Sequence, residues 1–203
     1  MLAAARPELD GRISAVAGLA AFTDLRDLIR LATTTGTPTT FLTLSVARSV
    51  CATLSPSDDR DALVADLAAV AVDDPDPIAC LRDRAAAEED ARAALALLTN
   101  TDPDRFDTLY AALPDDLRRH VEFLSPVAVA DRLRAPVELV WDARDKYFPL
   151  AHARALQEVA PTVRVTVISA LAHTDLSLSP RALADFGRIA GALARTLRAA
   201  RVG

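Results

Sequence analysis

The chain has 203 residues, of which 51% are apolar and 25% are charged, so it is able to bury a core and is not disordered by composition. Its formal net charge of −5 argues against a nucleic-acid surface, which needs Lys or Arg clustered on one face. No charged leader precedes an apolar segment and no apolar run is long enough to span a bilayer, so we expect a cytoplasmic protein without a membrane span.

The first 124 residues combine one strand with a long helical block. Residues 12–20 are continuous in Ile, Val and Ala, which is typical of a short buried strand. From residue 24 to 124 only helical periodicity is found, interrupted by capping residues and prolines. Cys51 and Cys80 fall in apolar helical patterns and are expected to be buried thiols, not a disulfide or a metal site. Helices are predicted over about 24–35, 38–54, 57–72 and 78–98, with two short ones restarted by Pro103 and Pro114.

The period changes after residue 124. Strands are predicted at 135–141 and 163–169, and a helix of about three turns lies between them, with Leu150, Leu156 and Val159 facing inward. A strand–helix–strand unit of this kind is nearly always parallel and right-handed. The last helix begins at Ser179 and Pro180, and its apolar stripe consists of Leu183, Phe186, Ile189, Ala190, Leu193 and Leu197.

Two chemically useful side chains follow the last two predicted strands. Asp145 ends the sequence "DARD" after the first of them, and His173 ends "ALAH" after the second. Because parallel strands end at the same edge of a sheet, we expect both side chains at one rim. An Asp that accepts the Nδ1–H of a His fixes its tautomer and stabilises the imidazolium formed when the His acts as a base.

These segments resemble the C-terminal half of an α/β-hydrolase. "LSPVAVADRLRAPVELVWDARDKYFPLAHARAL" is similar to the family's segment that carries the triad acid, and "VRVTVISALAH" to the strand and loop that carry the triad histidine. "RPELDGRISAVAGLAAFTDL" resembles the stretch after the nucleophile helix, including the sixth strand. Asp145 and His173 match the acid and the histidine of that motif.

The resemblance implies an α/β protein with a partial α/β-hydrolase fold, a short parallel sheet with a large helical insertion. Residues 1–23 would supply a core strand, 24–124 a lid over the active site, and 125–203 the C-terminal half of the core. The implied function is that of an esterase-like serine hydrolase acting on ester or related acyl bonds of a hydrophobic small molecule, with no cofactor and no metal.

The nucleophile of that family is absent from this sequence. No pair among the six glycines brackets a Ser, Cys or Asp in a G-x-S-x-G elbow, and the oxyanion-hole segment is missing too. Ser14 lies inside the predicted first strand and is not proposed as a nucleophile. Triad turnover is therefore not expected. Residues 1–7 resemble the last turn of the nucleophile helix, as in a truncated product whose reading frame begins too late.

Each residue also has a structural interpretation. Asp145 alone would be a turn or capping residue and His173 alone a surface histidine, but the two together favour the acid–histidine pair. We expect Asp142 to cap the turn and Trp141 to pack in the core. The remaining candidates carry less weight: Asp175 as a rival partner, Lys146 as a solvated side chain, and His120 and His152 in helical patterns.

The alternative function is that of a non-catalytic binding protein. The strand at residues 13–20 lacks the neighbour that it has in the family, so it would present an open apolar edge. Such an edge predicts a homo-oligomer or a partner chain. The helical block is equally consistent with a lid that shapes an acyl pocket and with ordinary core packing.

Overall fold

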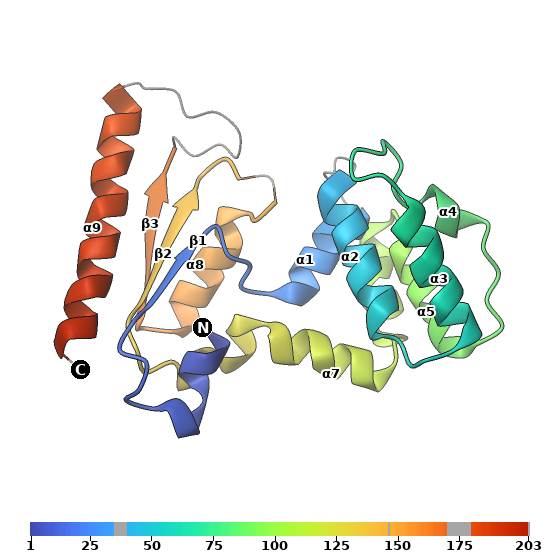
Figure 1. The fold of residues 1–203 in the computed structure, drawn as a ribbon, viewed down its shortest axis with the longest axis horizontal. Coiled ribbons are helices and arrows are strands. Elements are labelled where there is room, and N and C mark those ends of the chain that lie inside the picture. Colours follow the sequence, from blue (N-terminus) through green and yellow to red (C-terminus); the bar gives the residue numbers. More distant parts are fainter. Residues whose placement is uncertain (35–39, 146, 170–179, 203) are drawn as a thin grey trace. The chain divides into compact units, whose positions relative to one another are not determined.

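The computed structural model describes residues 1–34, 40–145, 147–169 and 180–202. The chain divides into a sheet unit, Met1–Leu25 with Phe123–Gly203, and a helical unit, Arg26–Glu122. The sheet unit holds a three-stranded parallel sheet between helices (Figure 1), so the predicted α/β class is confirmed. Within the described ranges no helix is both long and apolar enough to cross a membrane.

The sheet has the order β1 (Val16–Leu19), β2 (Val137–Asp142), β3 (Val163–Ile168), and both pairings are parallel. The predicted parallel strand–helix–strand unit is therefore confirmed. All six residues of β2 are buried, as a central strand covered on both faces requires. β1 differs from the prediction, because it begins only at Val16 and alternates between half-buried and exposed residues, with Leu19 60% exposed. As the edge strand of the described sheet, it has a neighbour on one side only.

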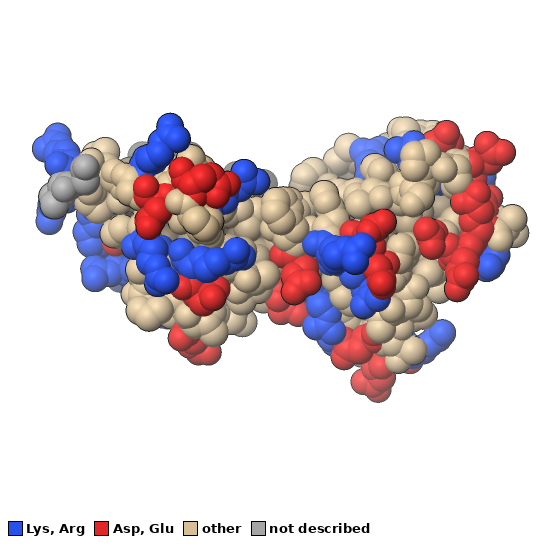
Figure 2. Space-filling model, turned by 90° about the horizontal axis from the view of Figure 1, so that it is seen from below, with Lys and Arg blue, Asp and Glu red and all other residues tan. Residues whose placement is uncertain are grey.

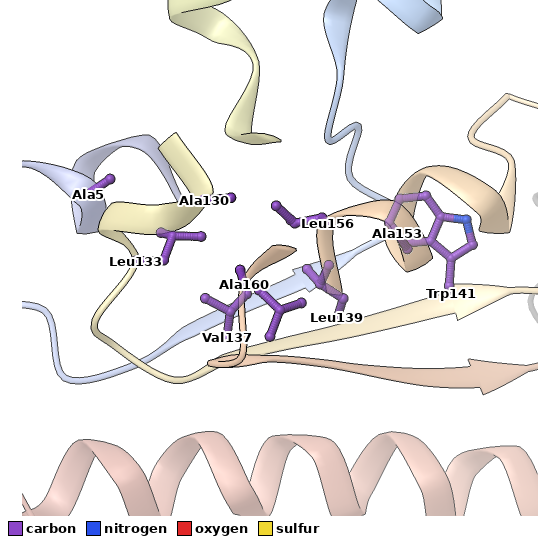
Figure 3. Close-up of a cluster of buried hydrophobic side chains, with 10 residues drawn as sticks. Ala5, Ala130, Leu133, Val137, Leu139, Trp141, Ala153, Leu156 and Ala160 are labelled. Carbon is purple, nitrogen blue, oxygen red and sulfur yellow. The ribbon is translucent and has the colours of Figure 1, made fainter. Parts of the chain in front are cut away.

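The two faces of the sheet are covered by different helices. On one face, the side chains of Leu139 and Trp141 pack against Ala153 and Leu156 of α8 (Leu150–Val159), as Figure 3 shows. On the other face, Val140 packs against α9 (Pro180–Val202) (Figures 1 and 3). The α8-side core also contains Ala5 of η1 (Leu2–Ala5), Ala130 of η4 (Pro126–Arg132) and Leu133, which follows η4. The short turn η2 (Pro7–Leu9) has no buried residue.

Large apolar side chains of α9 and α8 that were expected to face inward are exposed. The prediction for Val159 is wrong, because α8 packs through Ala153 and Leu156. In α9 the small residues Ala182 and Ala192 pack inward, which allows the helix to approach the sheet closely. The large side chains lie on its flank, between 46% and 68% exposed: Leu183, Phe186, Leu193 and Leu197.

The helical unit has a core of its own, and its largest fully buried side chains include Ile29, Leu44, Leu63, Leu67, Leu81, Leu97, Leu98 and Phe106. The single helix predicted at 78–98 is divided into two, because the acids from Glu88 onward favour a new helix N-terminus. The Glu88 N–H donates to Asp59 Oδ2 at 2.8 Å, which fixes that start. The helices are α1 (Leu25–Thr34), α2 (Thr40–Thr53), α3 (Asp58–Ala69), α4 (Ala79–Arg82), α5 (Glu89–Leu98), η3 (Pro103–Arg105), α6 (Phe106–Ala111) and α7 (Asp115–Leu124).

The two cysteines lie in different environments. Cys51 on α2 is buried as predicted, and burial, with a smaller contribution from Cys80, raises the pKa of its thiol to about 12. Cys80 on α4 is exposed, contrary to the prediction, because the next residue, Leu81, is the one that enters the core.

Candidate functional site

A hydrogen-bonded turn follows β2 at the carboxyl end of the sheet. Asp142, the last strand residue, is only 3% exposed, and its Oδ1 accepts the Arg144 N–H at 2.8 Å. The Asp145 N–H donates to the Asp142 carbonyl at 3.2 Å. The predicted capping role of Asp142 is therefore confirmed. The turn forms because an Asp side chain can accept the hydrogen bond of the backbone N–H two residues later, where the strand has ended.

Asp145 itself organises the second half of this turn. It is half-buried, and its Oδ1 accepts the N–H groups of Tyr147 at 2.8 Å and Phe148 at 3.0 Å. Trp141, fully buried on the α8 face, donates its indole N–H to the Phe148 carbonyl. The structural role that the sequence allowed for Asp145 is thus present. It leaves a second carboxylate oxygen, Oδ2, in a buried position.

The carboxyl ends of β2 and β3 remain joined beyond the strands. The Ala143 N–H donates to the Ile168 carbonyl at 3.0 Å, and the Arg144 guanidinium donates to the Ser169 carbonyl. The turn that carries Asp145 and the residue that precedes segment 170–179 are therefore held at one rim of the sheet. His173 and Asp175 lie outside the described residues, as does Lys146, so the contact between Asp145 and His173 stays a prediction.

Asp185 was not identified from the sequence, although it holds the same rim from α9. It is 1% exposed, and its Oδ2 accepts both the N–H of Ser169 at 2.8 Å and the hydroxyl of Ser169 at 3.0 Å. Arg188 donates to its Oδ1 at 2.6 Å. The Ser169 amide, followed by the Ser169 hydroxyl and Arg188, lowers the pKa of Asp185. In the sequence, Asp185 could have been found from its spacing, because it lies one helical turn from each of the inward-facing residues Ala182 and Ile189.

Asp142 presents a second buried carboxylate oxygen at this rim. Its Oδ1 is used by the turn, whereas its Oδ2 is buried and meets no hydrogen-bond donor in the described part of the chain. A buried carboxylate oxygen left in this state is costly. Asp142 is therefore the alternative acceptor for a donor arriving at the rim.

Ser14 lies at the other end of the sheet. It precedes β1 and is not inside a strand, so the predicted strand position of Ser14 is wrong. Parallel strands place it at the amino ends, and the six residues of β2 span about 20 Å at the usual rise of a strand. This separation from Asp145 is far beyond the reach of a nucleophile and its acid.

The other two histidines lie on helices. His120 is exposed on α7, and His152 lies on α8 with its carbonyl accepting the Thr23 hydroxyl at 2.9 Å. The described residues also contain no group of three or more His, Cys, Asp or Glu side chains that could hold a metal ion. Comparisons of the chain with protein-family models, curated proteins and solved structures found no match.

Proposed function

We propose that the chain is an α/β-hydrolase-like protein whose sheet unit carries the acid and the histidine of a serine hydrolase acting on ester or related acyl bonds. The observation that supports it is the parallel pairing of β2 with β3 and the continued bonding of their ends through Ala143 and Arg144. His173 follows Ser169 by four residues, a reach of at most about 14 Å for an extended chain, which suffices for contact with the neighbouring turn.

In this proposal Asp145 accepts the Nδ1–H of His173 and holds the imidazole in the tautomer that can take a proton from an attacking serine. Asp185 accepts two hydrogen bonds from Ser169, the residue that precedes segment 170–179, and in this proposal it thereby orients the segment that carries His173. The helical unit would act as a lid that shapes a pocket for a hydrophobic acyl group. The serine elbow is not part of this sequence, so the chain alone is proposed to lack triad turnover.

The acid–histidine pair is tested by ¹⁵N NMR of the imidazoles in the purified chain. We expect the neutral His173 ring, assigned with His173→Gln, to be mainly the Nδ1–H tautomer, and Asp145→Asn to abolish that preference. Glu158→Gln, which removes an exposed carboxylate from α8, is the matched control and should change nothing. If His173 keeps its tautomer in Asp145→Asn, the proposed pair is contradicted. If the tautomer preference is lost only in Asp142→Asn, Asp142 and not Asp145 is the acceptor of the His173 Nδ1–H.

Catalysis is tested separately with a p-nitrophenyl ester. The purified chain should hydrolyse it no faster than the His173→Ala variant, because removal of a triad nucleophile costs several orders of magnitude in rate. Ester turnover by the purified chain that is lost in His173→Ala would contradict the proposed absence of triad turnover, because it would require a nucleophile within this sequence.

A second candidate function is association with another copy of the chain. It is favoured by the exposed edge strand β1 together with the exposed stripe on α9. Leu19 is level with Val140, which packs against α9, so Leu19 and α9 belong to the same face of the sheet. Pairing of β1 with its counterpart would extend the sheet across a two-fold axis and cover this apolar surface.

Self-association is measured by sedimentation velocity over a range of concentrations. We expect a dimer that Leu19→Lys converts to a monomer, because the ammonium would be trapped at the paired edge. Val72→Lys, at an equally exposed apolar residue of the helical unit, is the control and should leave the dimer intact. A monomer at every concentration would refute this second function without affecting the acid–histidine proposal.

A further inference from the structure

A small hollow lies at the amino end of the sheet, remote from the Asp145 rim. Its volume is about 210 Å³, and its polar lining consists of the three arginines Arg6, Arg132 and Arg134 with Asp10. Figure 2, which views the molecule from below, shows Lys and Arg residues beside Asp and Glu residues on the underside of the sheet unit, where the N-terminal helical turns lie in Figure 1.

The fold brings two of these arginines to the same side. Leu133 is buried between them in the core cluster that includes Ala5 and Ala130 (Figure 3). Leu133 is extended, so the side chains on either side of it, Arg132 and Arg134, point away from the core together. Ala5 of the same cluster also lines the hollow, so the arginines lie beside a well-packed part of the core.

Two of these guanidinium groups have no ion-pair partner among the described residues. Arg132 and Arg134 make no hydrogen bond or ion pair within the part of the chain that the structure describes. Arg6 has a loose, solvent-exposed pair with Glu8 at 3.7 Å. Asp10 uses its Oδ1 to accept the N–H of Gly11 at 3.0 Å. With three arginines and one aspartate, the lining carries two net positive charges in a protein whose net charge is −5.

We propose that this hollow binds a phosphate dianion, either free phosphate or the phosphate group of a small monoester. A phosphate monoester carries a charge of about −1.5 to −2 at pH 7, which balances the lining, whereas a monocarboxylate would leave it half neutralised. The planar guanidinium fork matches phosphate oxygens in pairs. A volume of about 210 Å³ is below the roughly 300–1,000 Å³ of pockets for drug-sized ligands, so it admits a phosphate and few further atoms.

The test is isothermal titration of the purified chain with inorganic phosphate at fixed ionic strength, since screening would otherwise alter every arm. We expect Arg132→Gln and Arg134→Gln each to raise Kd about tenfold, the loss typical of one charge-assisted contact. The matched controls are Arg198→Gln and Arg201→Gln, which remove arginines of α9 that do not line the hollow, and their Kd should stay unchanged.

Two further ligands, glycerol 3-phosphate and acetate, complete the test. Glycerol 3-phosphate that binds more tightly than inorganic phosphate would identify a monoester as the ligand, and equal affinity would identify free phosphate. Acetate should bind at least tenfold more weakly than either, by about the energy of one charge-assisted contact. The proposal is overturned if acetate matches phosphate, if the α9 variants lose as much affinity as the variants in the hollow, or if no binding is detected at about 10 mM phosphate.

Discussion

Gly11 and Gly187 of the sheet unit occupy opposite backbone environments. Gly11 has φ +69°, the left-handed region that only glycine enters without cost, and a Cβ there would meet nothing within 4 Å. Gly187 lies within α9, where an added Cβ would also meet nothing. Space therefore does not distinguish the two positions, and backbone conformation alone decides the effect of a methyl group.

The same substitution should consequently act with opposite sign at these two positions. We expect Gly11→Ala to lower the free energy of unfolding by about 1 kcal/mol, and Gly187→Ala to raise it by about 0.5–1 kcal/mol. Urea unfolding followed by the fluorescence of the single tryptophan, Trp141, measures both. Two changes of the same sign would show that the conformation at Gly11 does not govern its stability.

Asp185 makes the stability of the sheet unit depend on pH. Its pKa in the folded protein is lowered by the Ser169 amide, then by the Ser169 hydroxyl and Arg188, so the ionised form is favoured on folding. The stabilisation is complete above the unfolded value of about 3.9 and is lost as the pH falls through the lower folded value. We expect the free energy of unfolding of the wild type to exceed that of Asp185→Asn at pH 6, and the difference to shrink below about pH 4. A difference that is constant from pH 6 to 3 would contradict this linkage.

Single residues also show how far the sequence could be interpreted. Asp142 and Trp141 were assigned correctly because an Asp at a strand end and a tryptophan in an apolar strand each have one dominant use. Asp185 was missed because its partner, Ser169, lies 16 residues away on another element. Only the three-dimensional fold reveals that the acid is satisfied.

At the scale of elements, α9 is fixed to β2 by an ion pair between the buried Glu138 and the half-buried Arg195. Arg195 donates through two nitrogens to the Glu138 carboxylate, at 2.7 and 2.9 Å, and also to the Thr166 hydroxyl at 3.0 Å. Glu138 is buried, with Arg164 of β3 near it at 3.9 Å. The hydrogen bond to Glu138 raises the pKa of Arg195, which favours the charged guanidinium. The pair sets the rotation of α9 on the sheet.

Removal of one partner should cost more than removal of both. Arg195→Met leaves the Glu138 charge buried without its main partner, and we expect a loss of about 2–4 kcal/mol, discounted because Arg195 is partly exposed. The double variant Glu138→Gln with Arg195→Met should recover at least half of that loss. Denaturant unfolding of the two single variants and the double variant forms the cycle, and strictly additive losses would refute the coupling.

This ion pair also explains why the sequence did not indicate which stripe of α9 faces the sheet. Periodicity correctly located a helix, but α9 has two neighbouring stripes, one of small residues around Ala182 and Ala192 and one of large residues such as Phe186 and Leu193. Hydrophobicity favours the large stripe. The distant Glu138 selects the other, because Arg195 reaches it only when the small stripe faces the sheet.

At the scale of the whole molecule, the two units have separate cores and carry separate reporters. Trp141 is buried in the sheet unit and Cys51 in the helical unit. With its thiol pKa near 12 and no exposed surface, Cys51 should react with iodoacetamide only when the helical unit opens. Exposed Cys80 should react first, which allows Cys80→Ser to simplify the measurement.

A cavity made in one core should therefore be felt in that unit. We expect Leu156→Ala to lower the stability reported by Trp141 fluorescence by about 2–5 kcal/mol while the alkylation rate of Cys51 stays nearly constant. Leu63→Ala, within the helical core, should do the reverse. If both reporters shift together in both variants, the chain unfolds as a single cooperative system.

Some features of the candidate site could be predicted from the sequence, and others could not. The chain order of strand, turn and Asp145 was predictable because it is local, and the parallel pairing because handed crossover connections leave few alternatives. The clamp of Ser169 by Asp185 and the use of Asp145 Oδ1 by two amides depend on contacts that no short motif encodes.

The parallel pairing of β1 with β2 has a consequence for biosynthesis. Val137 follows its register partner Val16 by about 120 residues, and a ribosome that adds 5–20 residues per second needs roughly 6 to 24 s to translate that interval. The nascent β1 segment must wait for that time with its backbone unpaired, while the intervening helices emerge and fold. The order of translation therefore gives a chaperone a defined interval in which to shield it.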